Sequence, residues 1–424
     1  MSSVEDKLPE GWMETTFGEQ YLDVLNGYAF KSKDFATRKI DENYLPVLKI
    51  KNVANGDANH NDVVFHLVEE KFEKYRIKEK DILIALTGNH PFAKTQVVGG
   101  VSRYKMKLDS LLNQRVAKLK AGNNELLNDD FIYNFFKWNE TQFYIGNQSS
   151  GSASQANISK NDILNIPLNL PPIQEQKAIA KVLTAFDDKI ENLRAQNQTL
   201  EQTAQTVFKE WFGKYQIDDE LPEGWRVGKL GEEFDISIGR TPPRKQTQWF
   251  SDKPIGKKWV SIKDIGNSGI YIDTTSEYLT DQAIDKFNIP VIPENTTILS
   301  FKMTVGKLTI TTEEMLSNEA IAHLKLKDGT CLTSEFIYLY LQNLDFNALG
   351  STSSIVTAIN STMIKNLDFV IPNEEKLKDF ESIVNSIFKK IKNNSKQIQT
   401  LTKTRDALLP KLMRGDIRVN GFKK

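Results

Sequence analysis

The side chains best suited to binding are cations that gather around turns in two parts of the chain. A Pro-Pro turn at 242–243 is surrounded by Arg240, Thr241, Arg244 and Lys245. Proline fixes the backbone of such a loop, and the planar fork of arginine matches the acceptor edge of guanine in the major groove. Half or more of the contacts in protein–DNA interfaces go to phosphate, however, so most of these cations are expected at the DNA backbone.

Further candidates lie in strand-and-loop segments that flank these turns. The complete set of candidate DNA-binding residues is Lys31, Lys33, Lys49, Lys51, Asn52, Arg240, Thr241, Arg244, Lys245, Lys263 and Lys302. We expect any single lysine of this set to contact phosphate, or to be ordinary surface, rather than to read a base. Asn52 can pair with adenine, but its counterpart in the second half is Asp264, and a turn at a strand edge is an equal alternative.

No catalytic motif accompanies these cations. An adenine methyltransferase needs Asn/Asp-Pro-Pro-aromatic to hold an everted base, and the nearest string, at 169–172, has an extra residue and reads as a strand-to-helix stop. Gly306-Lys307 lacks the first glycine of a phosphate-binding loop. The four histidines are scattered and there is one cysteine, Cys331, so no zinc site is recognisable. The sequence therefore predicts a non-catalytic chain that holds no metal or cofactor of its own.

Composition permits nucleic acid as a partner without favouring it. The chain has 424 residues, with 55 basic and 55 acidic side chains, whereas DNA-binding proteins usually carry a basic excess. Residues 21–120 hold about six more cations than anions. No apolar run approaches the roughly 20 residues of a membrane span, the N-terminus has no signal-peptide pattern, and a single cysteine fits a reducing compartment. We expect a cytoplasmic protein.

The segments that position the candidate residues occur twice along the chain, as an internal repeat. The motif LPEGW occurs at 8–12 and again at 221–225. Three further matched segments keep the same order: 50–53 with 262–265, 113–119 with 318–324, and 131–133 with 336–338. Between these anchors the halves differ heavily, which is typical of one frame kept in two copies with different specificities. We interpret Trp12 and Trp225 as core anchors of that frame.

Each copy ends in a short strand and then a long helix. Apolar residues alternate at 166–170 and at 367–371, prolines follow, and the period then becomes helical. The first apolar seam is Ile179, Val182, Phe186, Ile190, Leu193, Asn197, Leu200, Ala204, Val207 and Trp211. The second is Phe380, Ile383, Ile387, Ile391, Asn394, Ile398, Leu401, Arg405, Leu408 and Leu412.

The two seams have the same steps of three and four, which predicts a coiled coil with one stutter. Each helix can run for about 35–40 residues, roughly 50–60 Å. The segment 215–222 is too short for a parallel return, so the helices are expected to pair antiparallel within the chain. Asn197 and Asn394 interrupt the seams, either as tolerated defects or as devices that fix the register.

The predicted fold is mixed α/β (α+β). Two globular target-recognition domains are joined by two long helices that form an antiparallel intramolecular coiled coil with pseudo-two-fold symmetry. The predicted segments are a first domain at 1–171, a helical region at 172–217, a second domain at 218–371, and a helical region with a tail at 372–424. Two readers at a fixed spacing suit a duplex with two half-sites separated by unread bases.

With this organisation the sequence resembles the specificity subunit of type I restriction–modification enzymes over essentially its whole length. The resemblance is carried by the LPEGW openings, by 26–35 and 239–245, by Asn113-Gln114 and Asn318-Glu319, and by the closing segment 408–417. Glu319 in place of the more usual glutamine, and Arg405 on the helical seam, depart from the family pattern.

The resemblance implies partners and cofactors outside this chain. Two methyltransferase (modification) subunits that bind S-adenosylmethionine would dock on it and methylate adenine in a two-part target on double-stranded DNA. An ATP- and Mg-dependent restriction subunit, where one exists, would add translocation and cleavage. The alternative is a coiled-coil adapter whose end domains bind proteins, which the neutral net charge favours slightly and the order of the repeats opposes.

Overall fold

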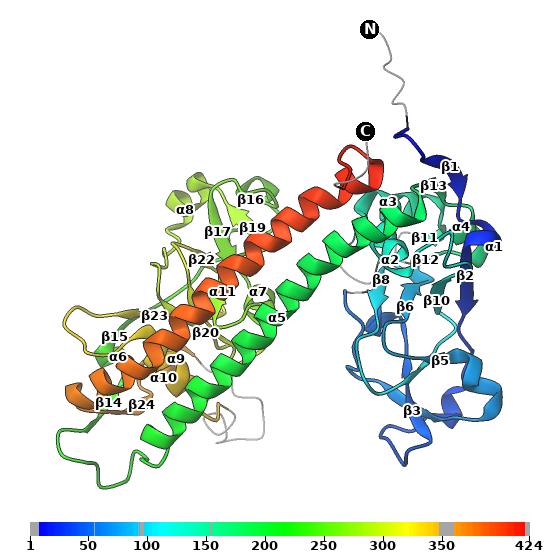
Figure 1. The fold of residues 1–424 in the computed structure, drawn as a ribbon. Coiled ribbons are helices and arrows are strands. Elements are labelled where there is room, and N and C mark those ends of the chain that lie inside the picture. Colours follow the sequence, from blue (N-terminus) through cyan, green and yellow to red (C-terminus); the bar gives the residue numbers. More distant parts are fainter. Residues whose placement is uncertain are drawn as a thin grey trace. The chain divides into compact units, whose positions relative to one another are not determined.

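The computed structural model describes residues 8–419 except 55, 92, 94–96, 153–154 and 347–359. The chain forms two compact units, residues 1–190 with 400–424 and residues 191–399. Each unit contains one domain and part of each long helix, α5 (Ile173–Phe212) and α11 (Glu374–Arg414) (Figure 1). The two units are defined by contacts within the folded chain, so each combines parts of several of the four segments predicted from the sequence.

The domain of the first unit is built on two four-stranded sheets. Its strands are β1 (Met13–Thr16), β2 (Leu22–Asn26), β3 (Tyr44–Leu48), β4 (Val64–Leu67), β5 (Arg76–Ile77), β6 (Ile82–Ala85), β7 (Thr87–Gly88), β8 (Val101–Arg103), β9 (Ser110–Leu112), β10 (Val116–Ala121), β11 (Ser150–Ser152), β12 (Gln155–Asn157) and β13 (Pro167–Leu170). Its helices are α1 (Gly18–Tyr21), α2 (Asp129–Lys137), α3 (Asn139–Gln148) and α4 (Lys160–Leu164), with short 3-10 segments at η1 (Ser32–Asp34), η2 (Ile50–Asn52) and η3 (Glu70–Tyr75).

The larger core of this unit lies between the main sheet and its helices. The main sheet has the antiparallel order β2-β10-β6-β8, and α2 packs on β8 and β10. The Asn128 side chain caps α2 by accepting from the Phe131 backbone N–H; α2 buries Phe131 in the core and stacks Phe136 on Phe17. The second sheet, β4-β3-β9-β5, includes the parallel pair β3–β9, and β11-β12-β7 forms a third.

The domain of the second unit repeats this arrangement with different lengths. Its strands are β14 (Arg226–Lys229), β15 (Phe234–Ile238), β16 (Phe250–Ser251), β17 (Lys257–Val260), β18 (Tyr271–Ile272), β19 (Glu277–Leu279), β20 (Thr297–Ser300), β21 (Leu308–Thr311), β22 (Leu316–Ser317), β23 (Ile321–Leu326) and β24 (Asp368–Ile371). Its helices are α6 (Leu230–Glu233), α7 (Ile262–Asn267), α8 (Asp281–Phe287), α9 (Ser334–Gln342) and α10 (Ser361–Lys365), with a 3-10 turn at η4 (Thr247–Trp249).

The duplication predicted from the sequence is confirmed strand by strand. The main sheet of the second unit has the order β15-β23-β20-β21-β18, so its first four strands correspond to β2-β10-β6-β8. The parallel pair β17–β22 corresponds to β3–β9. In each copy the strand after LPEGW pairs antiparallel with the strand before the long helix, β1 with β13 and β14 with β24. The predicted mixed α/β architecture is therefore correct.

The opening tryptophans anchor this frame, as expected. Trp12 is buried in the first core and its indole N–H donates to Glu175 Oε2 at 2.9 Å. Trp225 is half-buried and packs at 4.6 Å, centroid to centroid, from Tyr215.

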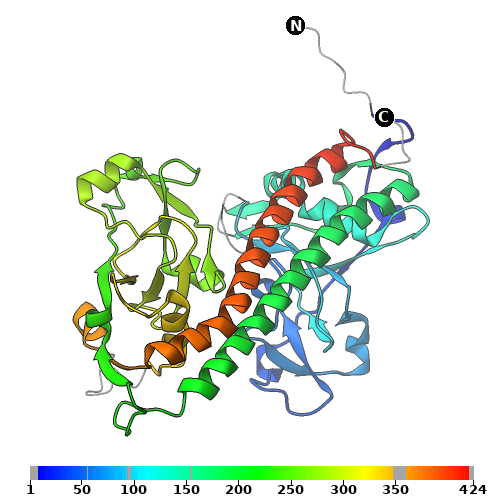
Figure 2. The same ribbon diagram turned by 60° about the vertical axis from the view of Figure 1, so that its left-hand side comes forward.

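A long helix follows the proline at the end of each domain. α5 starts two residues after Pro171 and has 40 residues, and α11 starts two residues after the equivalent Pro372 and has 41. At 1.5 Å per residue each is about 60 Å long. Figures 1 and 2 show α5 (green) and α11 (orange to red) side by side.

Within each unit the pairing is antiparallel, which confirms the prediction. In the first unit Asp187 of α5 meets Arg405, and Glu175, twelve residues earlier, meets Arg418 beyond the end of α11. In the second unit the Asn394 amide donates to Asn197 Oδ1 at 2.9 Å, and farther along α5 the Phe212 ring packs on Phe380. The two seam asparagines therefore bind each other, which favours register control over a tolerated defect.

Both predicted seams are partly out of phase. In α5, Phe208 and Phe212 are buried where the prediction placed Val207 and Trp211, which are half-buried. Ile383 was placed on the apolar seam, but it is 41% exposed, while Val384 and Phe388 are buried at 2% and 1%. The first half of α11 packs both on α5 and on the domain core of the second unit, so its buried stripe is wider than a two-helix seam and is centred one residue later. In the described part of the chain, none of the helices is both long and apolar enough to cross a membrane.

Candidate nucleic-acid interface

In the second domain the candidate residues lie on the loop that follows β15. Gly239 begins this loop in close contact with the β22–β23 connection: a Cβ there would lie 2.2 Å from Ser317 Oγ. The Arg240 N–H then donates to Ser317 O at 2.9 Å, and the Trp259 indole donates to Arg240 O at 3.2 Å. The glycine thus brings the loop onto the sheet and leaves its next side chains at the surface.

The two arginines of this loop are held in defined orientations. The Arg244 guanidinium packs over the rings of Phe250 and Trp259, at 4.3 and 4.5 Å from their centroids, and donates to Glu277 at 2.8 Å. Arg240 donates from one guanidinium nitrogen to Phe287 O at 3.0 Å. Each contact uses one nitrogen of the fork, so the remaining donors stay available to an acceptor from outside.

Glu319 is the centre around which several predicted residues gather. Its carboxylate accepts a hydrogen bond from the Thr241 hydroxyl. Burial raises the pKa of Glu319, but the bond from Thr241 and the charges of Lys302 and Arg244 outweigh burial and lower it. The carboxylate therefore stays ionised and fixes the loop, which gives a role to the residue that departs from the family pattern. Lys245 and Lys263 are exposed, but no described contact brings them into this cluster.

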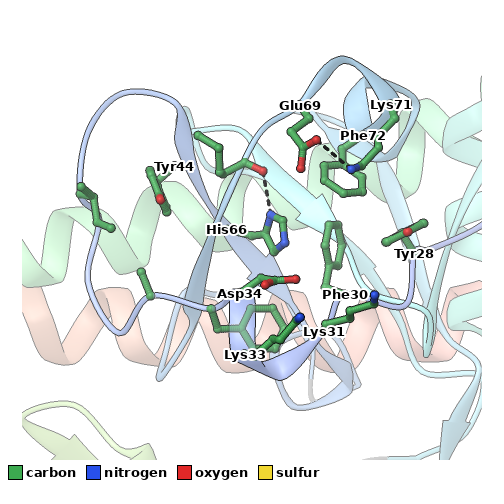
Figure 3. A pocket seen from close by; sticks show the side chains of 14 residues that line it. Tyr28, Phe30, Lys31, Lys33, Asp34, Tyr44, His66, Glu69, Lys71 and Phe72 are labelled. Atoms are coloured by element: carbon green, nitrogen blue, oxygen red, sulfur yellow. Dashed lines mark hydrogen bonds and ion pairs between the residues drawn. The ribbon is translucent and has the colours of Figure 1, made fainter.

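In the first domain Lys31 and Lys33 line an open pocket of about 550 Å³. Figure 3 shows it between the turn at η1, the strand β4 and the turn at η3. Its lining is aromatic and charged: Tyr28, Phe30, Lys31, Lys33, Asp34, Phe35, Ala36, Ile40, Tyr44, His66, Leu67, Glu69, Lys71 and Phe72.

The floor of this pocket is a rigid group of rings. His66 is 5% exposed and its Nδ1 lies 2.7 Å from Leu67 O, so Nδ1 carries the proton in the neutral ring. The rings of Phe30 and Phe72 lie 4.8 and 5.2 Å from it, centroid to centroid. Lysines at the rim of such a pocket can contact the phosphates of a strand that passes over it, whereas rings stack on bases only where a strand is unpaired.

The remaining candidates of the first domain have local partners. The Lys49 ammonium lies 4.7 Å from the centre of the Phe35 ring, and Lys51 is 3.7 Å from Asp62. Asn52 is 1% exposed, accepts from the Lys49 N–H at 3.1 Å and donates to Asn61 O at 2.8 Å. Its amide is thus used within the turn, so the structure favours the turn role over pairing with adenine.

Asp264, the counterpart of Asn52, has the same kind of role. It is 8% exposed and accepts from the N–H and hydroxyl of Ser261, which caps α7.

Sequence reasoning missed the pocket rings and the part played by Glu319. Tyr28 and Phe30 stand two apart in the segment 26–35, a spacing that puts both on one face of an extended chain. His66 and Phe72 arrive from other elements, and no local signal points to them. No group of three or more His, Cys, Asp or Glu able to hold a metal occurs among the residues that the structure describes.

The duplicated frame recurs in known proteins. A family model described as "Type I restriction modification DNA specificity domain" matches residues 9–202 and again residues 222–403. The chain belongs to this family. The two matches fall on the two halves of the internal repeat. Each match covers one domain and most of the long helix that follows it.

Members of the specificity-domain family are similar to the chain over nearly its full length. The MjaIX specificity subunit of Methanocaldococcus jannaschii, a type I restriction enzyme subunit, is 27% identical, with 91% of this chain and 94% of the relative covered. The HindI specificity subunit of Haemophilus influenzae is 24% identical, with 81% and 88% covered. Curated relatives thus carry the name of specificity subunits, which are distinct from methyltransferase and restriction subunits.

A solved structure shares the fold. The S subunit of a type I restriction–modification system from M. genitalium superimposes with a TM-score of 0.55 at 16% identity, covering 97% of this chain and 98% of that one.

Proposed function

We propose that this chain is the DNA sequence-specificity subunit of a type I restriction–modification assembly. The observation that carries the proposal is the match of the specificity-domain family to both halves of a duplicated chain. Each unit would read one half of a two-part target on double-stranded DNA, with an unread spacer between the halves. The chain itself would be non-catalytic and would act in the cytoplasm.

The reading surfaces would differ between the units. In the second unit we assign Thr241, Arg244 and Lys302, which surround Glu319. In the first unit we assign Lys31 and Lys33 beside the aromatic pocket. Arg240, Lys49, Lys51, Lys245 and Lys263 would contact phosphates, since each has an exposed or half-exposed cation and most such contacts go to the DNA backbone.

The chemistry would come from partners that dock on this chain. Two methyltransferase subunits would supply S-adenosylmethionine and evert the adenine that they methylate. ATP-dependent restriction subunits would join where the assembly also cleaves. A neutral chain has no overall attraction for phosphate, so we expect tight DNA binding only when positively charged partner surface is added.

The test is selection from a random duplex pool. The chain, alone and with its cognate methyltransferase, is titrated against the pool in a mobility-shift assay, and the bound fraction is sequenced. We expect enrichment of a two-part motif with a gap of constant length, strongest with the methyltransferase present. A well-formed complex that enriches no motif would support the adapter instead.

A matched pair of variants assigns the half-sites. Lys31→Ala with Lys33→Ala should weaken selection in one half of the motif and leave the other half unchanged. Lys120→Ala is the control, because Lys120 is exposed in the same domain at the opposite end of the β2–β10 ladder. Equal loss of selection in both halves of the motif would mean that the two lysines add general attraction for DNA and do not contact one particular half-site.

A further inference from the structure

Met303, at the tip of the β20–β21 hairpin, is the most exposed large apolar side chain in the described part of the protein. It is 95% exposed, and Val305 beside it is 39% exposed. Its φ is +60°, a left-handed conformation that side chains other than glycine, asparagine and aspartate rarely adopt. A methionine at this position is both strained and without cover, so neither local conformation nor packing within the described chain explains it.

The turn beneath Met303 is rigid. The Ser300 N–H donates to Lys307 O, and the Gly306 N–H donates to Ser300 O, both at 2.9 Å. The Ser300 hydroxyl donates to Thr304 O at 2.5 Å and accepts from the Lys307 N–H at 3.1 Å. These bonds close the base of the hairpin, so the tip is held out from the sheet in one conformation.

Two further contacts anchor the same turn to the domain. The Phe301 N–H donates to Ala320 O at 2.9 Å and its ring is buried, which ties the turn to the strand that follows Glu319. Gly306 packs against the Phe346 ring so closely that a Cβ would lie 2.9 Å from it. The exposed methionine is therefore presented by a supported structure.

The electrostatics of the tip favour an anionic partner. Lys302 precedes Met303 and Lys307 lies at the base of the same turn; both are exposed, and residues 301–307 include no acidic residue. The bond from the Phe301 N–H to Ala320 O places the hairpin next to Glu319, which accepts from Thr241. An apolar tip between two cations matches a stack of base pairs between two phosphate strands.

We propose that Met303 inserts between two adjacent base pairs of the DNA bound by the second unit, unstacks them and bends the duplex there. Methionine is slender, unbranched and flexible, and apolar wedges of this kind kink DNA at the step they enter. Insertion selects steps that unstack easily, so Met303 adds specificity at a position that no hydrogen bond reads. This inference rests on the proposed function and adds a specificity-determining residue to it.

The test uses the complex with its methyltransferase and the duplex motif recovered by selection. 2-Aminopurine is placed at each step of the half-site of the second unit, and the bend is measured by energy transfer between labelled duplex ends. We expect one step to become fluorescent on binding, and Met303→Ala to abolish that signal, reduce the bend and weaken binding about tenfold. The signal of the base that the methyltransferase everts should stay unchanged, which separates the two distortions.

Two controls make the result decisive. Ile255→Ala removes another exposed apolar side chain, 58% accessible, from a different loop of the same unit and should change neither bend nor fluorescence. Wild-type bend and fluorescence in Met303→Ala would overturn the wedge, and so would equal losses in Ile255→Ala. Failure of the wild-type complex to select any motif is a separate result, because it counts against the proposed function.

Oxidation of methionine to its sulfoxide gives an independent readout. Under mild peroxide, DNA should protect Met303 in the complex, while Met13, 52% exposed in the first unit, serves as the reference. Equal oxidation of Met303 with and without DNA would contradict insertion. Protection by the methyltransferase alone, without DNA, would assign the tip to a protein contact and would also overturn the proposal.

Discussion

The two units fasten their domains to the long helices by different chemistry. In the first unit, Lys137 of α2 and Arg405 of α11 both bind the carboxylate of Asp187 on α5, at 3.2 and 2.5 Å. All three side chains are less than a third exposed. Burial raises the pKa of Asp187, but the two cations outweigh it and lower the pKa, so the carboxylate is ionised. The departure of Arg405 from an apolar seam is thereby explained.

In the second unit the equivalent junction is mostly aromatic. Phe380 of α11 packs on Phe212, Phe208 and Trp211 of α5, with ring centroids 4.9 to 5.9 Å apart. The only carboxylate among the described contacts between α9 and α5, Glu201, accepts from the hydroxyl of Tyr338 at 2.9 Å and from an amide. An ion triad fails when one member is lost, whereas a ring cluster loses stability in proportion to the volume removed.

The largest expected effect is in the ring cluster. Phe380→Ala removes a side chain that is fully buried and touches four rings, so the second unit should lose about 4 kcal/mol of unfolding free energy. Native-state hydrogen exchange, read separately for residues 191–399, measures the loss. Ile383→Ala, three residues away and exposed, should cost less than about 1 kcal/mol. Similar losses for the two variants would mean that the cluster does not hold the junction.

The ion triad should respond almost as strongly to an isosteric change. Asp187→Asn leaves Lys137 without its carboxylate partner and Arg405 with only the exposed Asp406, and we expect about 3 kcal/mol of destabilisation, confined to the first unit. Exchange protection of α2 and of residues 400–414 reports it. A cost below 1 kcal/mol would show that solvent screens the triad despite its burial.

Acid should distinguish the units next. His323 is fully buried in the main sheet of the second unit, between the hydroxyls of Ser317 and Ser237, and burial, aided by Lys325, lowers its pKa to about 3. The unfolded chain takes up this proton near pH 6.5, so the stabilisation is complete above that pH and is lost as the pH falls towards 3. The slope is at most about 1.4 kcal/mol per pH unit.

Comparison with His323→Gln isolates this effect. Unfolding of the second unit, followed from pH 7 to pH 5, should be less pH-dependent in the variant by about 1 to 2 kcal/mol. An unchanged slope would mean that the pKa of His323 is the same in the folded and the unfolded protein.

The smallest effect is expected in the second unit, for the hydrogen bond between Glu201 of α5 and Tyr338 of α9. Glu201→Gln keeps an acceptor for the Tyr338 hydroxyl, so the second unit should lose less than about 1 kcal/mol. This variant is the direct counterpart of Asp187→Asn. Equal costs for the two changes, measured by the same exchange experiment, would mean that the ion triad of Asp187 contributes no more than the hydrogen bond of Glu201.

The sequence predicted what depends on periodicity and order. Repeated motifs identified two copies of one frame, and steps of three and four placed both long helices and their antiparallel pairing correctly. The phase at Ile383 was wrong because α11 packs on two neighbours there, and a two-helix seam describes only one of them.

The candidate sites were less accessible to sequence reasoning. Lys31 and Lys33 were named, but His66 and Phe72, which complete their pocket, come from separate elements that only the fold brings together. Asn52 has the side chain of an adenine reader, yet its burial and its bonds to Lys49 and Asn61 could not be deduced from residue type. The assignment of residues to bases or phosphates therefore remains a prediction.

Glu175 joins the two ends of the first unit, and this affects when that unit can fold during synthesis. Glu175 is completely buried and holds both the Trp12 indole and the Arg418 guanidinium, and the core around it also takes Leu412 and Met413. A ribosome releases Trp12 early and Arg418 some 400 residues later. The second unit, a contiguous segment, can complete its core first, whereas the unit synthesised first must wait for the last helix. A chain whose translation stops before residue 400 would expose the first core to proteases.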